Sequence, residues 1–204
     1  NYHQIDSDLR IHYLDEGNTN DPVILLLHGE PSWSYLYRTM IPSLVSNGFR
    51  VVAPDLIGFG KSDKPAEQSD YTYAKHIDWI QAVLDHLKLN EIHMFIQDWG
   101  GLIGLRLLTA NPDNFASVVA ANTMLPTGSV TPPKAFLDWQ NFAATSPKFD
   151  VATVIQMATT TNLTADVIAA YNAPFPDDSY KAGARVFPAL VPTSEQDTES
   201  ENNK

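Results

Sequence analysis

The chain has 204 residues, of which 44% are hydrophobic and 10% are aromatic, so it can bury a sizeable core and is expected to form one globular domain, with or without an insertion. Its 13 lysine and arginine residues are outnumbered by 24 aspartate and glutamate residues, and the net charge of −11 argues against nucleic acid and against a membrane surface as partners. It contains no cysteine, so disulfide and thiolate chemistry are excluded, and no apolar stretch is long enough to span a membrane. We therefore expect a soluble, cytoplasmic protein.

Predicted strands and helices alternate along the first part of the chain. Residues 9–14 alternate between polar and apolar side chains like a strand, and residues 22–27 form a continuous apolar strand of the kind that is covered on both sheet faces. The elements that follow are a helix at 33–46, a strand at 49–53, a helix at 71–87, a strand at 92–96, a helix at 102–108 and a strand at 116–121. This order predicts a doubly wound, mostly parallel α/β sheet, in which ligands bind at the carboxyl ends of the strands.

Proline residues punctuate the chain from Thr123 onward, and the helical pieces between them predict a helical insertion over the sheet. We therefore expect the N-terminal part of a core at residues 1–122, a helical cap at 123–194 and the start of a returning core segment at 195–204. The last residues, from Thr193 on, are polar and acidic. A solvated tail and the start of a further helix both fit that composition.

Asp98 lies between the strand at 92–96 and the helix that follows it, where hydrolases often carry a nucleophile. A sharp strand-to-helix turn lifts its middle side chain out of the sheet, and the N–H groups that open the helix favour negative charge. Gly100 and Gly101 allow the backbone to pack closely there. An aspartate at this place is also a common helix N-cap, so the turn needs a second signal.

The second signal is the turn His28–Pro31, which ends the apolar strand at 22–27. If the backbone N–H groups of Glu30 and Trp99 face each other, they form an oxyanion hole. A glycine turn after a strand is commonplace by itself, and its value comes from being paired with the Asp98 turn. Together the two turns favour a catalytic role for Asp98 over an N-cap.

Several separate segments resemble one family. His28–Arg38, Pro54–Pro65 and Gln97–Gly101 closely resemble the haloalkane dehalogenases of the α/β-hydrolase superfamily, and the similarity spans nearly the whole chain. The later segment Ala173–Gly183 resembles the cap of the subgroup that also carries glutamate after His-Gly. The resemblance implies an α/β-hydrolase core with a helical cap, and this set of motifs is more specific than a nucleophile turn alone.

The resemblance also implies a reaction: a small halogenated alkane and water give an alcohol and a halide ion. Asp98 would displace the halide and form an alkyl ester, which water then hydrolyses, so neither a cofactor nor a metal is expected. A carboxylate suits the first step because it is ionised near neutral pH without a base. Trp99 and Trp139 match the family's two indole donors to the departing halide.

Positions that match the family's substrate pocket are apolar and come from both parts of the chain; they are Leu102, Phe136, Phe187, Pro188 and Val191. The aromatic residues Phe136, Trp139 and Phe142 share one helix face, a pattern that is more often ordinary core. For Trp139 the family match outweighs that alternative, whereas each of the pocket residues fits packing equally well.

The sequence departs from a complete enzyme in its histidines. All six, at positions 3, 12, 28, 76, 86 and 93, precede Asp98, whereas the superfamily order is nucleophile, acid and then histidine base. Asn122 stands where a second subgroup carries its acid, and Glu30 can help hold the water but cannot replace an imidazole base. We therefore expect the 204 residues to be an internal piece, truncated at both ends, that lacks the acid and the base for turnover.

Two other functions stay open. An epoxide hydrolase or a haloacid dehalogenase shares the fold and the aspartate nucleophile, but epoxide opening needs tyrosine acids in the cap, where this chain offers only Tyr171 and Tyr180 beside Trp139. A non-catalytic binding scaffold would keep the pocket without turnover. The sequence indicates neither the preferred haloalkane nor an oligomeric state.

Overall fold

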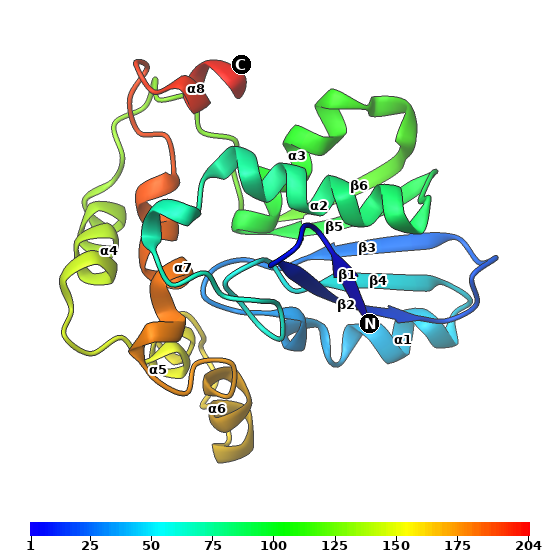
Figure 1. Ribbon diagram of the computed structural model, residues 1–204, viewed down its shortest axis with the longest axis horizontal. Coiled ribbons are helices and arrows are strands. Elements are labelled where there is room, and N and C mark those ends of the chain that lie inside the picture. The colour runs from blue at the N-terminus through cyan, green and yellow to red at the C-terminus, as the bar shows by residue number, and fades with distance from the viewer.

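A six-stranded sheet organises the computed structural model, which describes all 204 residues (Figure 1). The strands lie in the order β1-β2-β4-β3-β5-β6, with bounds β1 Tyr2–Gln4, β2 Arg10–Glu16, β3 Val23–Leu27, β4 Arg50–Pro54, β5 Ile92–Gln97 and β6 Phe115–Ala121. β2 pairs antiparallel with both β1 and β4, whereas β4, β3, β5 and β6 run parallel. The predicted mostly parallel α/β sheet is confirmed, and the short β1 extends it beyond the predicted strands.

Helices cover both faces of the central strands. α1 (Met40–Ser46) packs on one face, and α2 (Tyr73–Leu87) and α3 (Trp99–Ala110) lie on the other (Figure 1). Successive side chains of β3 point to opposite faces, so Leu25 belongs to the larger buried cluster with α2 and α3, and Leu26 to the smaller one with α1. Burial on both faces explains why β3 is a continuous apolar run rather than an alternating one.

Local side-chain chemistry sets where the predicted helices begin. α2 starts two residues later than its predicted range, because Thr72 caps it by accepting a hydrogen bond from the Lys75 N–H at 3.1 Å. The predicted helix at 33–46 is divided into a short 3-10 turn at Ser34–Tyr37 and α1. Pro42 accounts for the division, since proline is tolerated in the first turn of a helix but excludes a continuous helix through the preceding turn.

Four further helices lie beyond the carboxyl ends of the parallel strands: α4 (Lys134–Thr145), α5 (Val151–Met157), α6 (Ala165–Asn172) and α7 (Ala182–Val186). Figure 1 shows them gathered to the left of the sheet. They correspond to the predicted helical cap, whose boundaries at 122 and 194 stay a prediction.

Helix α7 packs closely against the core. A Cβ atom added at Gly183 would lie 3.1 Å from the Cα atom of Gly58 and 2.9 Å from the Tyr71 ring, so no larger residue fits without a shift. Gly58 belongs to the loop after β4, which carries part of the candidate site. The cap therefore rests directly on the loops at the carboxyl end of the sheet.

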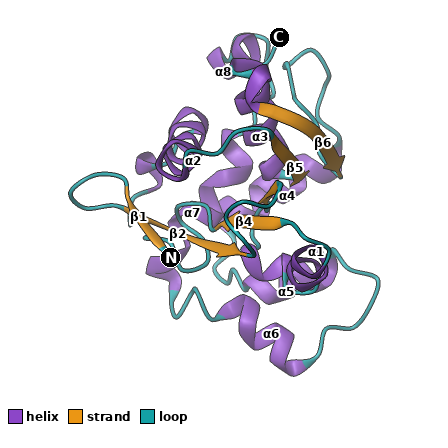
Figure 2. Ribbon diagram, turned by 90° about the vertical axis from the view of Figure 1, so that its right-hand side faces the viewer, coloured by secondary structure: helices purple, strands orange, loops and turns teal.

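The acidic C-terminal segment forms a short helix, α8 (Thr198–Asn202), rather than a solvated tail. Arg106 on α3 donates to the carboxylate of Glu199 at 2.8 Å, and the side chain of Asn203 donates to the Pro126 carbonyl at 2.7 Å. Ser200 is fully buried. In both views α8 lies at the same end of the molecule as α3, whereas α6 lies at the opposite end (Figure 1, Figure 2).

Strand β6 is the exposed edge of the sheet. Its side chains are largely in contact with solvent, with Val118 38% and Val119 57% exposed. An apolar edge strand presents unpaired backbone groups that can pair with another chain. Among the helices, none is both long and apolar enough to cross a membrane.

The contact between α3 and the sheet generates a stability prediction. Ile103 is fully buried in the larger core cluster, so Ile103→Ala is expected to lower the free energy of unfolding by about 2–5 kcal/mol through lost burial and the cavity left behind. Urea denaturation followed by circular dichroism measures the change. Leu137→Ala, at a side chain in the cap that is 45% exposed, is the matched control and should change stability by no more than about 0.5 kcal/mol. Equal losses in both variants would contradict this account of the core.

Candidate active site

Asp98 occupies a strained turn between β5 and α3. Its φ of 52° and ψ of −123° lie outside the regions that residues with a side chain ordinarily adopt. Close packing holds the turn in place, because a Cβ atom at Gly29 would collide with the Asp98 side chain and one at Gly100 with the Leu27 carbonyl. The hydroxyl of Thr123 donates to the Asp98 carbonyl at 2.7 Å. Gly29 and Gly100 thus leave no room for a side chain in these two turns.

The Asp98 carboxylate is held by backbone donors. The Glu30 N–H donates to Asp98 Oδ1 at 2.8 Å, and the Trp99 N–H also bonds the carboxylate. Burial raises the pKa of Asp98, and the two N–H groups act against that rise because they stabilise the ionised form. Both N–H groups of the predicted oxyanion hole therefore bond the Asp98 carboxylate, and that of Glu30 bonds Oδ1.

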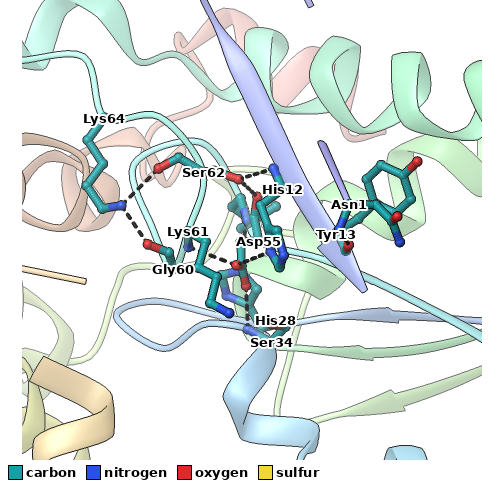
Figure 3. A network of polar contacts seen from close by, with 11 residues as sticks. Asn1, His12, Tyr13, His28, Ser34, Asp55, Gly60, Lys61, Ser62 and Lys64 are labelled. Atoms are coloured by element: carbon teal, nitrogen blue, oxygen red, sulfur yellow. Dashed lines mark hydrogen bonds and ion pairs between the residues drawn. The ribbon is translucent and has the colours of Figure 1, made fainter. Parts of the chain in front are cut away.

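A buried polar network lies behind these turns and is centred on Asp55, which follows β4 (Figure 3). Its carboxylate contacts His12 Nδ1 of β2 at 2.8 Å and accepts backbone hydrogen bonds from Ser34 at 2.8 Å and Lys61 at 2.9 Å. Burial opposes ionisation of Asp55, but the hydrogen bonds from His12, Lys61 and Ser34 outweigh it, so its pKa is lowered. One ionised carboxylate thus joins β2, the loop after β3 and the loop after β4.

His28 has a structural role in the same region. Its ring is fully buried, with Nδ1 2.9 Å from the Gly29 carbonyl and Nε2 accepting the Leu56 N–H at 2.9 Å. These two bonds place the proton on Nδ1 and keep the ring neutral, and burial lowers its pKa. Since both ring nitrogens are occupied, His28 is not available as a base for the Asp98 turn.

A cavity of about 490 Å³ opens between the Asp98 turn and the cap. Asp98, Trp99 and Glu30 line it from the core, and Trp139 lines it from α4. Four of the five predicted pocket residues also line it: Leu102, Phe136, Pro188 and Val191. No histidine, lysine or arginine lines the cavity, and the chain holds no group of three or more metal-ligating side chains.

Trp99 and Trp139 line the cavity, and neither indole N–H has a hydrogen bond to a protein acceptor. Trp99 is buried and held by the rings of Tyr73 and Phe187, with centroids 5.2 Å and 4.7 Å away. Trp139 is half-buried and stacks on Phe142, 5.8 Å away between ring centroids. Both indoles are therefore oriented by aromatic neighbours while their N–H groups keep the capacity to bond an anion.

Phe187 is placed differently from its prediction as a pocket residue. It is fully buried and does not line the cavity, because its ring is enclosed by Trp99, Phe59 and His76, each 4.5–4.7 Å away between ring centroids. Its contribution is to support the Trp99 ring from behind. His76 has no hydrogen-bond partner in this aromatic enclosure, and burial lowers its pKa to about 3.

The Asp55 network generates a prediction about pH. Because the pKa of Asp55 is lowered in the folded state, the stability it contributes is present above the unfolded pKa of about 3.9 and is lost as pH falls through the folded value. Asp55→Asn is expected to cost about 3–5 kcal/mol at neutral pH, since it leaves buried His12 without its charged partner. The difference from the parent protein should shrink below about pH 4.

Urea denaturation at several pH values measures this difference. Asp63→Asn is the matched control in the same loop, because Asp63 pairs with the exposed Arg10 and is expected to contribute only about 1 kcal/mol. A gap between the Asp55 variant and the parent that is independent of pH would show that the charge of Asp55 is not what stabilises the loops.

Comparisons with known proteins identify the fold and the family of the chain. The family model of the alpha/beta hydrolase fold matches residues 22–182. A haloalkane dehalogenase of Psychrobacter cryohalolentis is 60% identical over 98% of this chain and 66% of its own length, and one of Mycolicibacterium paratuberculosis is 52% identical over 93% and 63%. The chain thus spans somewhat less than two thirds of the length of these curated relatives.

A solved structure gives the same result. The tetrameric haloalkane dehalogenase DpaA of Paraglaciecola agarilytica superposes with a TM-score of 0.94 at 38% identity, over 100% of this chain and 69% of that one. A common fold at this identity indicates common ancestry. Its sequence, its sheet and its relatives together show that the chain belongs to the haloalkane dehalogenase family of the α/β-hydrolase fold.

Proposed function

We propose that this chain carries the carbon–halogen cleavage step of a haloalkane dehalogenase, with Asp98 as the nucleophile. The observation that supports the proposal most strongly is the position of the Asp98 carboxylate. It lies at a strained turn, with Oδ1 bonded by the Glu30 N–H, in a cavity that Trp99 and Trp139 also line. A nucleophile and donors for a leaving anion thus share one largely apolar cavity.

In the first step, an electron pair of Asp98 Oδ2 attacks the carbon that bears the halogen, since Oδ1 is held by Glu30. The carbon–oxygen bond forms as the carbon–halogen bond breaks, and the halogen leaves with the bonding electrons as halide. Trp99 and Trp139 donate to the halide as its charge develops. The carboxylate needs no proton transfer for this step.

In the second step, water attacks the carbonyl carbon of the Asp98 ester. The developing oxyanion is Oδ1, which the Glu30 N–H already contacts, and the Trp99 N–H, which also bonds the carboxylate, is the second donor that we expect to stabilise it. The attacking water must give up a proton, and no histidine lines the cavity to accept it. We therefore infer that the residues of this chain favour ester formation and do not supply a base for hydrolysis.

The arrangement favours a halide over an epoxide as the leaving group. No tyrosine lines the cavity. Tyr171 is buried against Tyr35 and Arg38, and Tyr180 is 43% exposed. Opening an epoxide requires an acid near the oxygen that leaves, whereas a halide is stabilised by neutral donors such as indole N–H groups.

The proposal predicts the stoichiometry of halide release. The purified 204-residue chain, mixed with an excess of 1-bromobutane, should release about one equivalent of bromide and then stop, because its ester is not hydrolysed. Ion chromatography measures bromide, and mass spectrometry should find one butyl group on the peptide that contains Asp98. Asp98→Asn is expected to release none. Sustained release well beyond one equivalent would contradict the lack of a base, and no release would contradict the nucleophile.

The halide donors are tested by removing one indole. Trp139→Phe keeps an aromatic ring but loses the N–H group, so the rate constant of the bromide burst is expected to fall roughly 10²-fold. Trp79→Phe, at a buried indole of α2 that does not line the cavity, should burst at a rate near that of the parent. Rapid-mixing measurements of bromide give both rates. If the two variants slow alike, Trp139 acts through packing rather than as a donor.

A further inference from the structure

The side chain of Glu30 places a second carboxyl group in the site of Asp98, and no positive charge or hydrogen-bond donor is paired with this second group. Its backbone N–H bonds Asp98 Oδ1, whereas its own side-chain atom Oε1 is enclosed and has no hydrogen-bond partner. Glu30 also lines the cavity together with Asp98 and Trp99. Two carboxyl groups thus belong to one site, and only one of them has donors.

The number of donors decides which group carries the charge. Removing a carboxylate from water costs several kcal/mol unless hydrogen bonds replace the lost hydration. Asp98 has the N–H groups of Glu30 and Trp99, whereas the enclosed Oε1 of Glu30 has no donor from the protein. Two neighbouring carboxyl groups in one site also resist ionising together. The single negative charge therefore belongs on Asp98.

The groups around Glu30 offer no compensating positive charge. No lysine, arginine or histidine lines the cavity. His28 precedes it in the turn but is neutral, with both ring nitrogens bonded elsewhere, and the Tyr37 hydroxyl donates to the Leu27 carbonyl at 2.7 Å. Burial first, and the charge of Asp98 second, raise the pKa of Glu30 well above its ordinary value.

We propose that Glu30 is a positioning residue that stays a neutral carboxylic acid in the resting site and that its proton is required for carbon–halogen cleavage. The proposal rests on the function proposed above. A neutral Glu30 leaves Asp98 as the only anion, whereas an ionised Glu30 would repel the departing halide in a largely apolar cavity. The halide would then leave against a second negative charge, and the rate of ester formation would fall.

The proposal also links the two carboxyl groups through the reaction. When Asp98 becomes an ester it loses its charge, and with that charge goes the smaller of the two causes that hold Glu30 neutral. Glu30 should therefore ionise at a lower pH in the ester than in the resting site. Asp98→Asn imitates the neutral ester and allows this link to be measured without substrate.

The rate of the bromide burst from 1-bromobutane, measured at about pH 7 and about pH 10, tests the requirement for the proton. In the parent chain the rate constant should fall about tenfold or more as pH rises, because like charges in a low-dielectric site repel strongly. Glu30→Gln keeps a neutral side chain at both pH values, so its two rate constants should be nearly equal. Glu67→Gln, at an exposed glutamate, is the matched control and should fall like the parent. A level rate in the parent, or an equal fall in Glu30→Gln, would overturn the proposal.

Infrared difference spectroscopy of the resting chains gives a readout that needs no halide release. The parent should show the band of a protonated carboxyl group at about pH 7, Glu30→Gln should lack it, and in Asp98→Asn it should disappear at a lower pH than in the parent. Absence of the band in the parent would refute a neutral Glu30. A band that behaves as expected in chains that release no bromide would instead refute the proposed function and leave the assignment of the proton standing.

Discussion

The hydrogen bond from the Glu30 N–H to Asp98 Oδ1 is the contact on which the site depends. It joins two turns that are 68 residues apart in the chain, one after β3 and one after β5. The turns approach so closely that Gly29 can have no side chain, and Asp98 keeps an unfavourable backbone conformation because its neighbours leave no alternative. The same N–H orients the carboxylate for attack and lies where an oxyanion would form, so one contact serves both halves of the proposed reaction.

Three carboxyl groups near this contact differ in how readily they ionise because they differ in donors. Asp55 has a histidine in addition to two backbone N–H groups, and its pKa is lowered. Asp98 has two N–H groups, and its pKa is raised by burial in spite of them. The Glu30 side chain has none, and its pKa is raised well above the ordinary value. Residue type alone would give these groups nearly the same behaviour, so the folded backbone decides how readily each of them ionises.

Local patterns predicted most of the fold because each element of the core has a clear signal. The apolar runs at β3 and β5 and the helical spacing of α2 follow from burial on both sheet faces and on one helix face. The expectation that the backbone N–H groups of Glu30 and Trp99 face each other followed from recognising the two turns alone. The contact of His12 with Asp55 spans 43 residues, and nothing local indicates it. Phe187 was misplaced for the same reason: whether an aromatic ring touches a cavity or stands behind its wall depends on how helices pack, which spacing does not encode.

Strand β6 and the net charge have opposite effects on whether copies of the 204-residue chain associate. Its exposed valines and unpaired edge favour contact between chains, and the net charge of −11 keeps chains apart. Charge repulsion between surfaces reaches only about 8 Å at physiological ionic strength and less at higher salt, whereas the attraction of an apolar strand edge is not screened. For the 204-residue chain, added salt is therefore expected to weaken the repulsion between chains first and to leave the edge of the sheet free to associate.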